Sequence, residues 1–151
     1  MKDVLRIEDL TKKFKKKNFF SSDSDEVIAA DSVNFSLEQG KILAIAGQSG
    51  SGKTTIAKLI LRAIKPDSGK IFHNQKEIMD NSDELKKFRM KCQMIYQDPY
   101  DSINPRMTIS DIVSEPLEIH NIGTKKEREQ RVLETLEKVK LEPAEEISKK
   151  Y

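Results

Sequence analysis

The eight residues from Gly47 to Thr54 constrain this chain more than any other segment of it. They match the pattern G-x-x-x-x-G-K-[ST] at every fixed position. Glycines let a backbone curl until several N–H groups point inward at phosphate oxygens, and a following helix adds its positive N-terminal end. In such a loop the Lys53 ammonium group contacts the β- and γ-phosphates, and the Thr54 hydroxyl is a ligand for Mg²⁺. The pattern predicts a binding loop for a nucleoside triphosphate; the alternative is a Gly/Ser turn with an incidental lysine.

The segments on either side of the loop favour phosphate binding over a simple turn. Residues 42–46 are continuously apolar, which is typical of a strand covered on both faces, and we expect that strand to span 41–46. Residues 54–64 carry apolar side chains at helical spacing until Pro66 prevents continuation of the helix. A buried strand, a glycine-rich loop and a helix are the context in which this pattern binds phosphate.

The rest of the first hundred residues alternates between strand patterns and turns. Residues 18–26 are rich in Ser and Asp and predict a surface loop. Alternating or continuous apolar runs bounded by turn residues predict strands, and polar residues with a capping Asn predict a short helix. The predicted strands span 4–10, 27–37, 69–72 and 92–97, and the predicted helix spans 81–89.

The remaining residues predict helices. Thr108 with Asp111, and Thr124 with Glu127, resemble capping boxes at two helix starts. The second of these helices has an apolar face, which predicts that it packs on its own domain. That face consists of Val132, Leu133, Leu136 and Val139.

Composition limits the classes of protein to which the chain can belong. Its 151 residues are enough for one modest domain or part of a larger one. A net charge of +2 is too small to indicate binding to nucleic acid. The single cysteine, Cys92, excludes an internal disulfide and fits a reducing, cytosolic setting. The longest apolar run, 42–46, is far shorter than the ~20 residues that span a bilayer, so we expect any membrane association to involve a partner.

The segment from Gln97 to Arg106 discriminates among families that share this type of loop. It follows a predicted strand and consists of Gln and then Asp-Pro-Tyr-Asp-Ser-Ile-Asn-Pro-Arg. This run resembles the Q-loop of the ATP-binding subunits of oligopeptide/dipeptide ABC importers, which has the form [DN]-P-[YF]-x-S-[LI]-N-P-R. A proline-rich turn between strand and helix would not account for Ser102, Asn104 and Arg106 at this spacing.

The resemblance covers essentially the whole chain and implies its architecture. It implies an α/β fold, the N-terminal part of an ABC-type P-loop NTPase. The expected parts are an antiparallel β-subdomain at 1–40, a P-loop core that reaches the Q-loop at 41–106, and part of a helical subdomain at 107–151.

The resemblance also implies roles for individual residues. An aromatic residue of the first subdomain stacks on adenine in this family, and Phe14 occupies the matching position; an ordinary half-buried strand residue is the alternative. Ser49 is expected at the γ-phosphate, Thr55 at the α-phosphate side, and Gln97 at Mg²⁺ or the attacking water. The expected ATP-binding residues are Phe14, Gly47, Ser49, Gly50, Ser51, Gly52, Lys53, Thr54 and Thr55, the expected Mg²⁺ ligands are Thr54 and Gln97, and the expected catalytic residues are Lys53 and Gln97.

Partners and location follow from the same resemblance. It implies a second ABC ATPase subunit, identical or different, and transmembrane permease subunits that contact the Q-loop and the helical subdomain. The chain is therefore expected in the cytoplasm, on the inner face of the cell membrane, with no nucleic acid as a partner. The transported solute is selected elsewhere and is open between a peptide, nickel and a sugar-derived oligomer.

The family pattern includes motifs that do not occur in these 151 residues: an L-S-G-G-Q signature, a Walker B Asp, a catalytic Glu and a switch His. We therefore expect a truncated chain that binds ATP and hydrolyses it very slowly or not at all, because no general base orients water. Two alternatives stay open. One is a small P-loop kinase, although no arginine-bearing lid motif is recognisable, and the other is a non-hydrolysing nucleotide-binding fragment.

Overall fold

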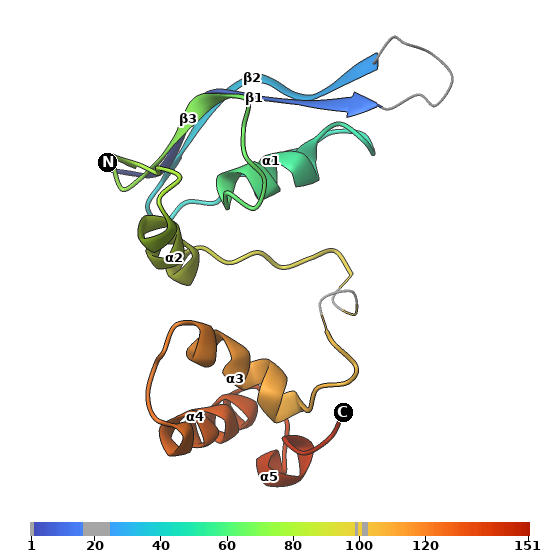
Figure 1. The fold of residues 1–151 in the computed structure, drawn as a ribbon, viewed down its shortest axis with the longest axis vertical. Helices are drawn as coiled ribbons and strands as arrows, with labels where there is room; N and C mark the ends of the chain where they lie inside the picture. The colour runs from blue at the N-terminus through green and yellow to red at the C-terminus, as the bar shows by residue number, and fades with distance from the viewer. Residues whose placement is uncertain (1, 17–24, 99, 101–102) are drawn as a thin grey trace. The chain divides into compact units, whose positions relative to one another are not determined.

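The structure is a computed structural model that describes residues 2–16, 25–98, 100 and 103–151. The chain divides into two compact units, Met1–Met94 and Ile95–Tyr151 (Figure 1). Of the predicted loop at 18–26, residues 18–24 lie outside the described residues, and the last two belong to a strand.

A four-stranded antiparallel sheet forms one layer of the first unit. Its strands are β1 (Asp3–Lys16), β2 (Asp25–Glu38), β3 (Ser68–His73) and β4 (Lys76–Glu77), in the spatial order β2-β1-β3-β4. The two long strands were predicted in part, at 4–10 and 27–37, and both extend further, β1 to Lys16 and β2 from Asp25.

Compensating bulges keep β1 and β2 paired along this length. Ile7 pairs with Phe35 and Leu10 with Val33, so β1 contains one extra residue there, and β2 contains one extra residue in the next step. Asp9 and Asn34 fix the first bulge: the Asp9 N–H donates to Asn34 Oδ1, and Asn34 Nδ2 donates to Asp9 Oδ1, each at 2.9 Å. The extra residue turns both Ile7 and Leu10 into the core, although strict alternation would place them on opposite faces.

Two helices complete the first unit. Helix α1 (Lys53–Ile60) lies along one face of the sheet in Figure 1, and α2 (Ser82–Lys91) follows β4. Asn81 caps α2 by accepting a hydrogen bond from the Asp83 N–H at 3.0 Å. Apolar side chains from the sheet and both helices form one core, namely Ile7, Leu10, Ala30, Ile56, Leu59, Ile71, Ile78 and Phe88.

The second unit is helical. It contains α3 (Ile109–Ile119), α4 (Lys125–Lys138) and α5 (Ala144–Ile147). Both predicted capping boxes are confirmed, at Thr108 with Asp111 and at Thr124 with Glu127. The core is formed by Val132, Leu136 and Ala144, with Ile109, Val113 and Leu133 packed against it. Val139, which was predicted on the same apolar face, is exposed, because it follows α4 as its C-cap and no longer continues the helical stripe.

The predictions of apolar strands at 41–46 and 92–97 are wrong. Both segments are irregular, and Ile42 and Ile95 are 98% and 93% exposed. An apolar run on both faces is the pattern of a central strand, which is stable only when neighbouring strands accept its N–H groups and cover its side chains. Within the described residues no strand pairs with either segment.

Among the described residues, none of the helices combines the length and the apolar composition that crossing a membrane requires.

Candidate nucleotide-binding site

The glycine-rich segment 47–52 connects the irregular residues 41–46 to the start of α1. Gly50 and Gly52 have φ angles of 80° and 90°, a left-handed conformation that side chains disfavour. The Ser51 N–H donates to the Gln48 carbonyl at 3.2 Å and closes a tight turn inside the loop. The sequence pattern and this backbone geometry agree, because two of the glycines occupy positions with a left-handed backbone.

Helix α1 presents an uncapped N-terminus to this loop. Its N-cap is Gly52, which has no side chain to accept a hydrogen bond, and its first turn contains no acidic residue. The helical bonds begin with the Ile56 N–H, which donates to the Gly52 carbonyl at 2.9 Å. The N–H groups of Lys53, Thr54 and Thr55 therefore come before the first N–H that donates to a helical carbonyl, and together with the helix dipole they favour an anion at this end.

The Lys53 side chain folds back over the loop. Its Nζ atom donates to the Gly47 and Gln48 carbonyls at 2.8 and 2.7 Å and to Ser51 Oγ at 3.3 Å. All three acceptors are neutral. A phosphate oxygen is a charged acceptor and makes a stronger, charge-assisted bond with an ammonium group. The geometry thus holds the lysine charge over the loop, where a phosphate would attract it.

The space around each glycine indicates where the loop has room for a phosphate group. A Cβ atom at Gly50 would meet nothing within 4 Å, so the loop is open there. A Cβ atom at Gly47 would lie 2.6 Å from Ser51 Oγ, and one at Gly52 would lie 2.0 Å from the Ala29 carbonyl oxygen. The open loop, the free N–H groups and the lysine together suit the polyphosphate of a nucleotide. The packing of Gly52 on Ala29 had no signal in the sequence, because it involves only the backbone of a distant strand.

Phe14, the predicted adenine platform, lies near the end of β1 and is 43% exposed. The Lys12 ammonium group lies 5.5 Å from its ring centroid. Phe14 pairs with Val27 on β2, and Val27 is two strand residues, or about 7 Å, from Ala29, on which Gly52 packs. An exposed aromatic ring and the glycine-rich loop therefore lie at the same stretch of β2.

Lys12 is held in place by a second contact. Its Nζ atom lies 2.9 Å from Asp67 Oδ1, and the Lys13 N–H donates to Asp67 Oδ2 at 2.7 Å. The hydrogen bond from the Lys13 backbone, and then the one from Lys12, hold the pKa of Asp67 below its ordinary value. The Asp67 carboxylate, just after Pro66, therefore ties the end of β1 to the start of β3.

Gln97 belongs to the second unit and is exposed. The loop around it is held by short-range bonds: Asp98 Oδ1 accepts from the Tyr100 N–H at 2.9 Å, and Asn104 Oδ1 accepts from the Arg106 N–H at 3.1 Å. Ser102 of the predicted Q-loop lies outside the described residues. The structure thus assembles the predicted residues of the phosphate-binding loop in one unit, and Gln97 stands in the other.

Thr54 is exposed at the second position of α1. The described residues contain no group of three or more His, Cys, Asp or Glu side chains that could hold a metal ion. Magnesium in nucleotide sites is held largely by phosphate oxygens and water, with few protein ligands, so the Thr54 hydroxyl suits that task.

Comparison with known proteins identifies the family. The model of the family described as ABC transporter matches residues 30–150, which is most of the chain. The chain belongs to the ABC transporter family. The matched region of this ABC chain includes the glycine-rich loop, the loop around Gln97 and nearly all of the helical unit.

Individual relatives carry related names. The chain is 38% identical over 144 residues to the oligopeptide transport ATP-binding protein AppF of Bacillus subtilis, covering 93% of this chain and 44% of that protein. It is 34% identical over 150 residues to the probable peptide ABC transporter ATP-binding protein y4tS of Sinorhizobium fredii, covering 98% of this chain and 42% of that protein. The chain therefore spans less than half the length of these curated relatives.

Solved structures show the same fold. The dimeric structure of the ABC transporter cassette MJ0796 matches with a TM-score of 0.74 at 26% identity, over 97% of this chain and 60% of that one. A structure of the same cassette in a post-hydrolysis state, bound to ADP and Pi, matches with a TM-score of 0.75. These matches confirm the predicted fold class, the N-terminal part of an ABC-type P-loop ATPase.

Proposed function

We propose that this chain is the ATP-binding part of an ATP-binding subunit in an ABC importer for peptides. The observation that carries the proposal is the loop at 47–54, with left-handed glycines, an uncapped helix and a lysine held over it. The names of the curated relatives support oligopeptides as the class of solute, although the chain spans only 36–44% of the first relatives.

ATP, together with Mg²⁺, is the proposed ligand, and its binding and the cleavage of its phosphoanhydride bond would drive transport. The chain's own residues would bind and orient the nucleotide. The N–H groups at the start of α1 and in the loop, including those of Gly50 and Gly52, bind phosphate oxygens, and Lys53 neutralises the β- and γ-phosphates. The Thr54 hydroxyl would hold Mg²⁺, and the remaining proposed contacts are Ser49 to the γ-phosphate, Thr55 to the α-phosphate side and Phe14 to adenine.

Gln97 is proposed to contact Mg²⁺ or the attacking water, and its loop to report the nucleotide state to the membrane subunit. A polypeptide of these 151 residues would bind ATP without appreciable turnover. It contains no L-S-G-G-Q signature and no segment that matches the family's Walker B Asp and catalytic Glu. Without that carboxylate, no general base orients the water that attacks the γ-phosphate.

The proposed partners are a second ATP-binding subunit and transmembrane permease subunits. The MJ0796 cassette is described as dimeric, which supports the first partner. The helical unit, Ile95–Tyr151, together with the loop around Gln97, is the proposed contact with the permease. This arrangement would place the chain in the cytoplasm, on the inner face of the cell membrane.

A lysine pair on one helix tests nucleotide binding. Lys53 contacts the loop, whereas Lys58 lies in the last turn of α1. We expect Lys53→Ala to weaken ATP binding at least about tenfold, because a charge-assisted contact to phosphate is lost, and Lys58→Ala to leave it unchanged. Titration of each variant with a fluorescent ATP analogue measures the two affinities. Full affinity in Lys53→Ala would overturn the assignment of the loop.

A further inference from the structure

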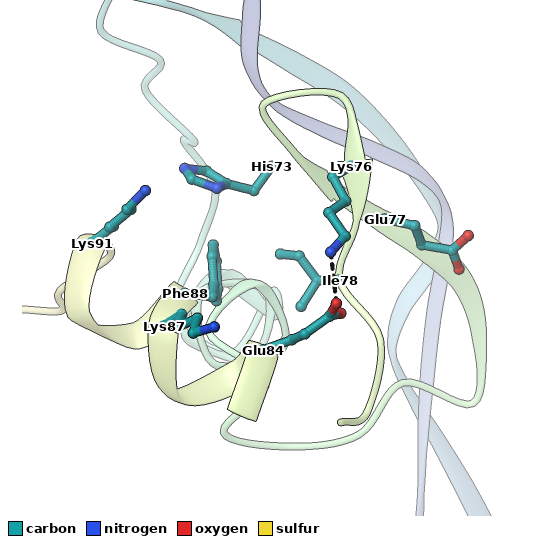
Figure 2. Close-up of a pocket in the computed structure, with 8 residues that line it drawn as sticks. All are labelled: His73, Lys76, Glu77, Ile78, Glu84, Lys87, Phe88 and Lys91. Atoms are coloured by element: carbon teal, nitrogen blue, oxygen red, sulfur yellow. Dashed lines mark hydrogen bonds and ion pairs between the residues drawn. The ribbon is translucent and has the colours of Figure 1, made fainter. Parts of the chain in front are cut away.

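A cavity lies at the junction of β3, β4 and α2. Its volume is about 160 Å³, and it is drawn in Figure 2. An engineered protein cavity of about 150 Å³ is large enough to take up benzene. The lining residues all lie between His73 and Lys91, so none of them belongs to the phosphate-binding loop or to the β1 end that carries Phe14.

The inner wall of this cavity is apolar and aromatic. Phe88 and Ile78 are buried members of the core, and His73 stands edge-on to Phe88 with 5.3 Å between the ring centroids. Burial, and then the charge of Lys91, lower the pKa of His73, so its ring is neutral near neutral pH. A planar ring entering the cavity would meet aromatic and aliphatic surfaces.

The rim carries an excess of positive charge. Lys76 pairs with Glu84, at 2.6 Å between Nζ and Oε1, and Glu77 pairs with Lys70 outside the cavity at 3.5 Å. In Figure 2 the Glu77 carboxylate points away from the other labelled side chains. Within the described part of the chain, Lys87 and Lys91 make no ion pair and no side-chain hydrogen bond. Both acids near the cavity are therefore paired, while two ammonium groups at its rim have no partner there.

We propose that this cavity binds a small aromatic carboxylate. The ring would lie against Phe88 and Ile78, and the carboxylate would accept hydrogen bonds from Lys87 and Lys91. Each lining glutamate is already paired with a lysine, so Lys87 and Lys91 supply the positive charge that attracts a carboxylate. A neutral ring would gain nothing from the two ammonium groups, and a carboxylate without a ring would leave the apolar wall uncovered.

Benzoate is the probe, with benzamide and acetate as matched controls that lack the charge and the ring. Aromatic-ring NMR spectra of the whole chain should show benzoate shifting the His73 and Phe88 signals with a dissociation constant of about 1 mM, tighter than either control. Lys87→Gln and Lys91→Gln should each weaken benzoate binding about threefold. Lys86→Gln, on the same helix but outside the lining, should not.

Three results would overturn this proposal: no shift at His73 and Phe88, equal binding of benzamide or acetate, or unchanged binding in both Lys87→Gln and Lys91→Gln. A Lys53→Ala control keeps the test separate from the nucleotide site, because that variant should lose ATP affinity and keep benzoate binding. Since Lys87 and Lys91 are exposed, their substitution leaves the fold intact, and a thermal unfolding curve checks this.

Discussion

A Cβ atom on Gly52 would lie 2.0 Å from the Ala29 carbonyl oxygen, so the glycine-rich loop packs its backbone directly against β2. Gly52 also has a φ angle of 90°. Two separate constraints therefore require glycine at this position of the ABC chain: the left-handed backbone and the contact with the strand. The same contact sets the distance between the loop and the strand pair that carries Phe14.

Gly52→Ala should destabilise the first unit by about 3 kcal/mol, the sum of left-handed strain and steric overlap with a strand backbone that cannot move freely. Gly40→Ala is the matched control. Its φ angle is 76°, but a Cβ atom there meets nothing within 4 Å, so it should cost only about 1 kcal/mol. Urea unfolding of the two variants measures the difference, and equal losses would show that the contact with Ala29 has no energetic weight.

The capping box of α4 gives a pH-dependent prediction. Hydrogen bonds from the Thr124 backbone, and then from its hydroxyl, hold the pKa of Glu127 below its ordinary value of 4.5. A carboxyl whose pKa is lower in the folded chain stabilises the fold above its unfolded pKa, and that stabilisation is lost as the pH falls through the folded value. Glu127→Gln should therefore lower the melting temperature at pH 7, and the deficit should shrink well below pH 4.5.

Glu129→Gln on the same helix is the control, because Glu129 is exposed and takes no part in the cap. Circular dichroism melts of the three proteins at pH 7 and pH 3 compare the effects. A deficit of the same size at both pH values would contradict a role for the charged carboxylate.

Cys92 gives a prediction on reactivity. Burial raises the pKa of its thiol above the ordinary value of 9.0, and the charge of Lys91 opposes the shift only in part. Because the thiolate is the nucleophile, Cys92 should react with an aromatic disulfide reagent at pH 8 about tenfold more slowly than free glutathione. In urea the difference should disappear. As the only cysteine, Cys92 gives an unambiguous absorbance signal, and fast reaction in the folded chain would show that the thiol is accessible.

The features predicted correctly from the sequence are those that depend on neighbours along the chain. The loop before α1 is specified by its glycines, and the caps of α3 and α4 by residues three positions apart, Thr108 with Asp111 and Thr124 with Glu127. The long β1–β2 pair was predicted only in part. The bulge at Asp9 and Asn34 shifts the alternation of buried residues, and the sequence contains no marker for such a shift.

The features missed by sequence reasoning depend on partners that are distant or belong to other strands. The contact between Gly52 and Ala29 involves only backbone atoms of Ala29. The cavity near His73 and Lys91 is lined by residues of both a strand and a helix. The strand predicted at 41–46 followed from its apolar pattern alone. That pattern indicates which side chains a strand would bury. It does not show whether neighbouring strands are present to form hydrogen bonds with the backbone N–H and C=O groups of that strand.

Substitution of Ile42 distinguishes the predicted strand at 41–46 from the irregular segment that is observed there. The side chain is 98% exposed, whereas Leu59 of α1 is fully buried in the core. Ile42→Ser should therefore change the free energy of unfolding by no more than about 0.5 kcal/mol, whereas Leu59→Ala should lower it by about 3 kcal/mol because a cavity forms.

Ile42→Ser should also reduce self-association of the chain, because it removes a 98% exposed side chain from an apolar run that pairs with no strand among the described residues. Urea unfolding and light scattering at rising protein concentration measure the two effects. If Ile42→Ser instead destabilises the chain as strongly as Leu59→Ala, the segment is packed in solution, and the strand expected from its sequence forms after all.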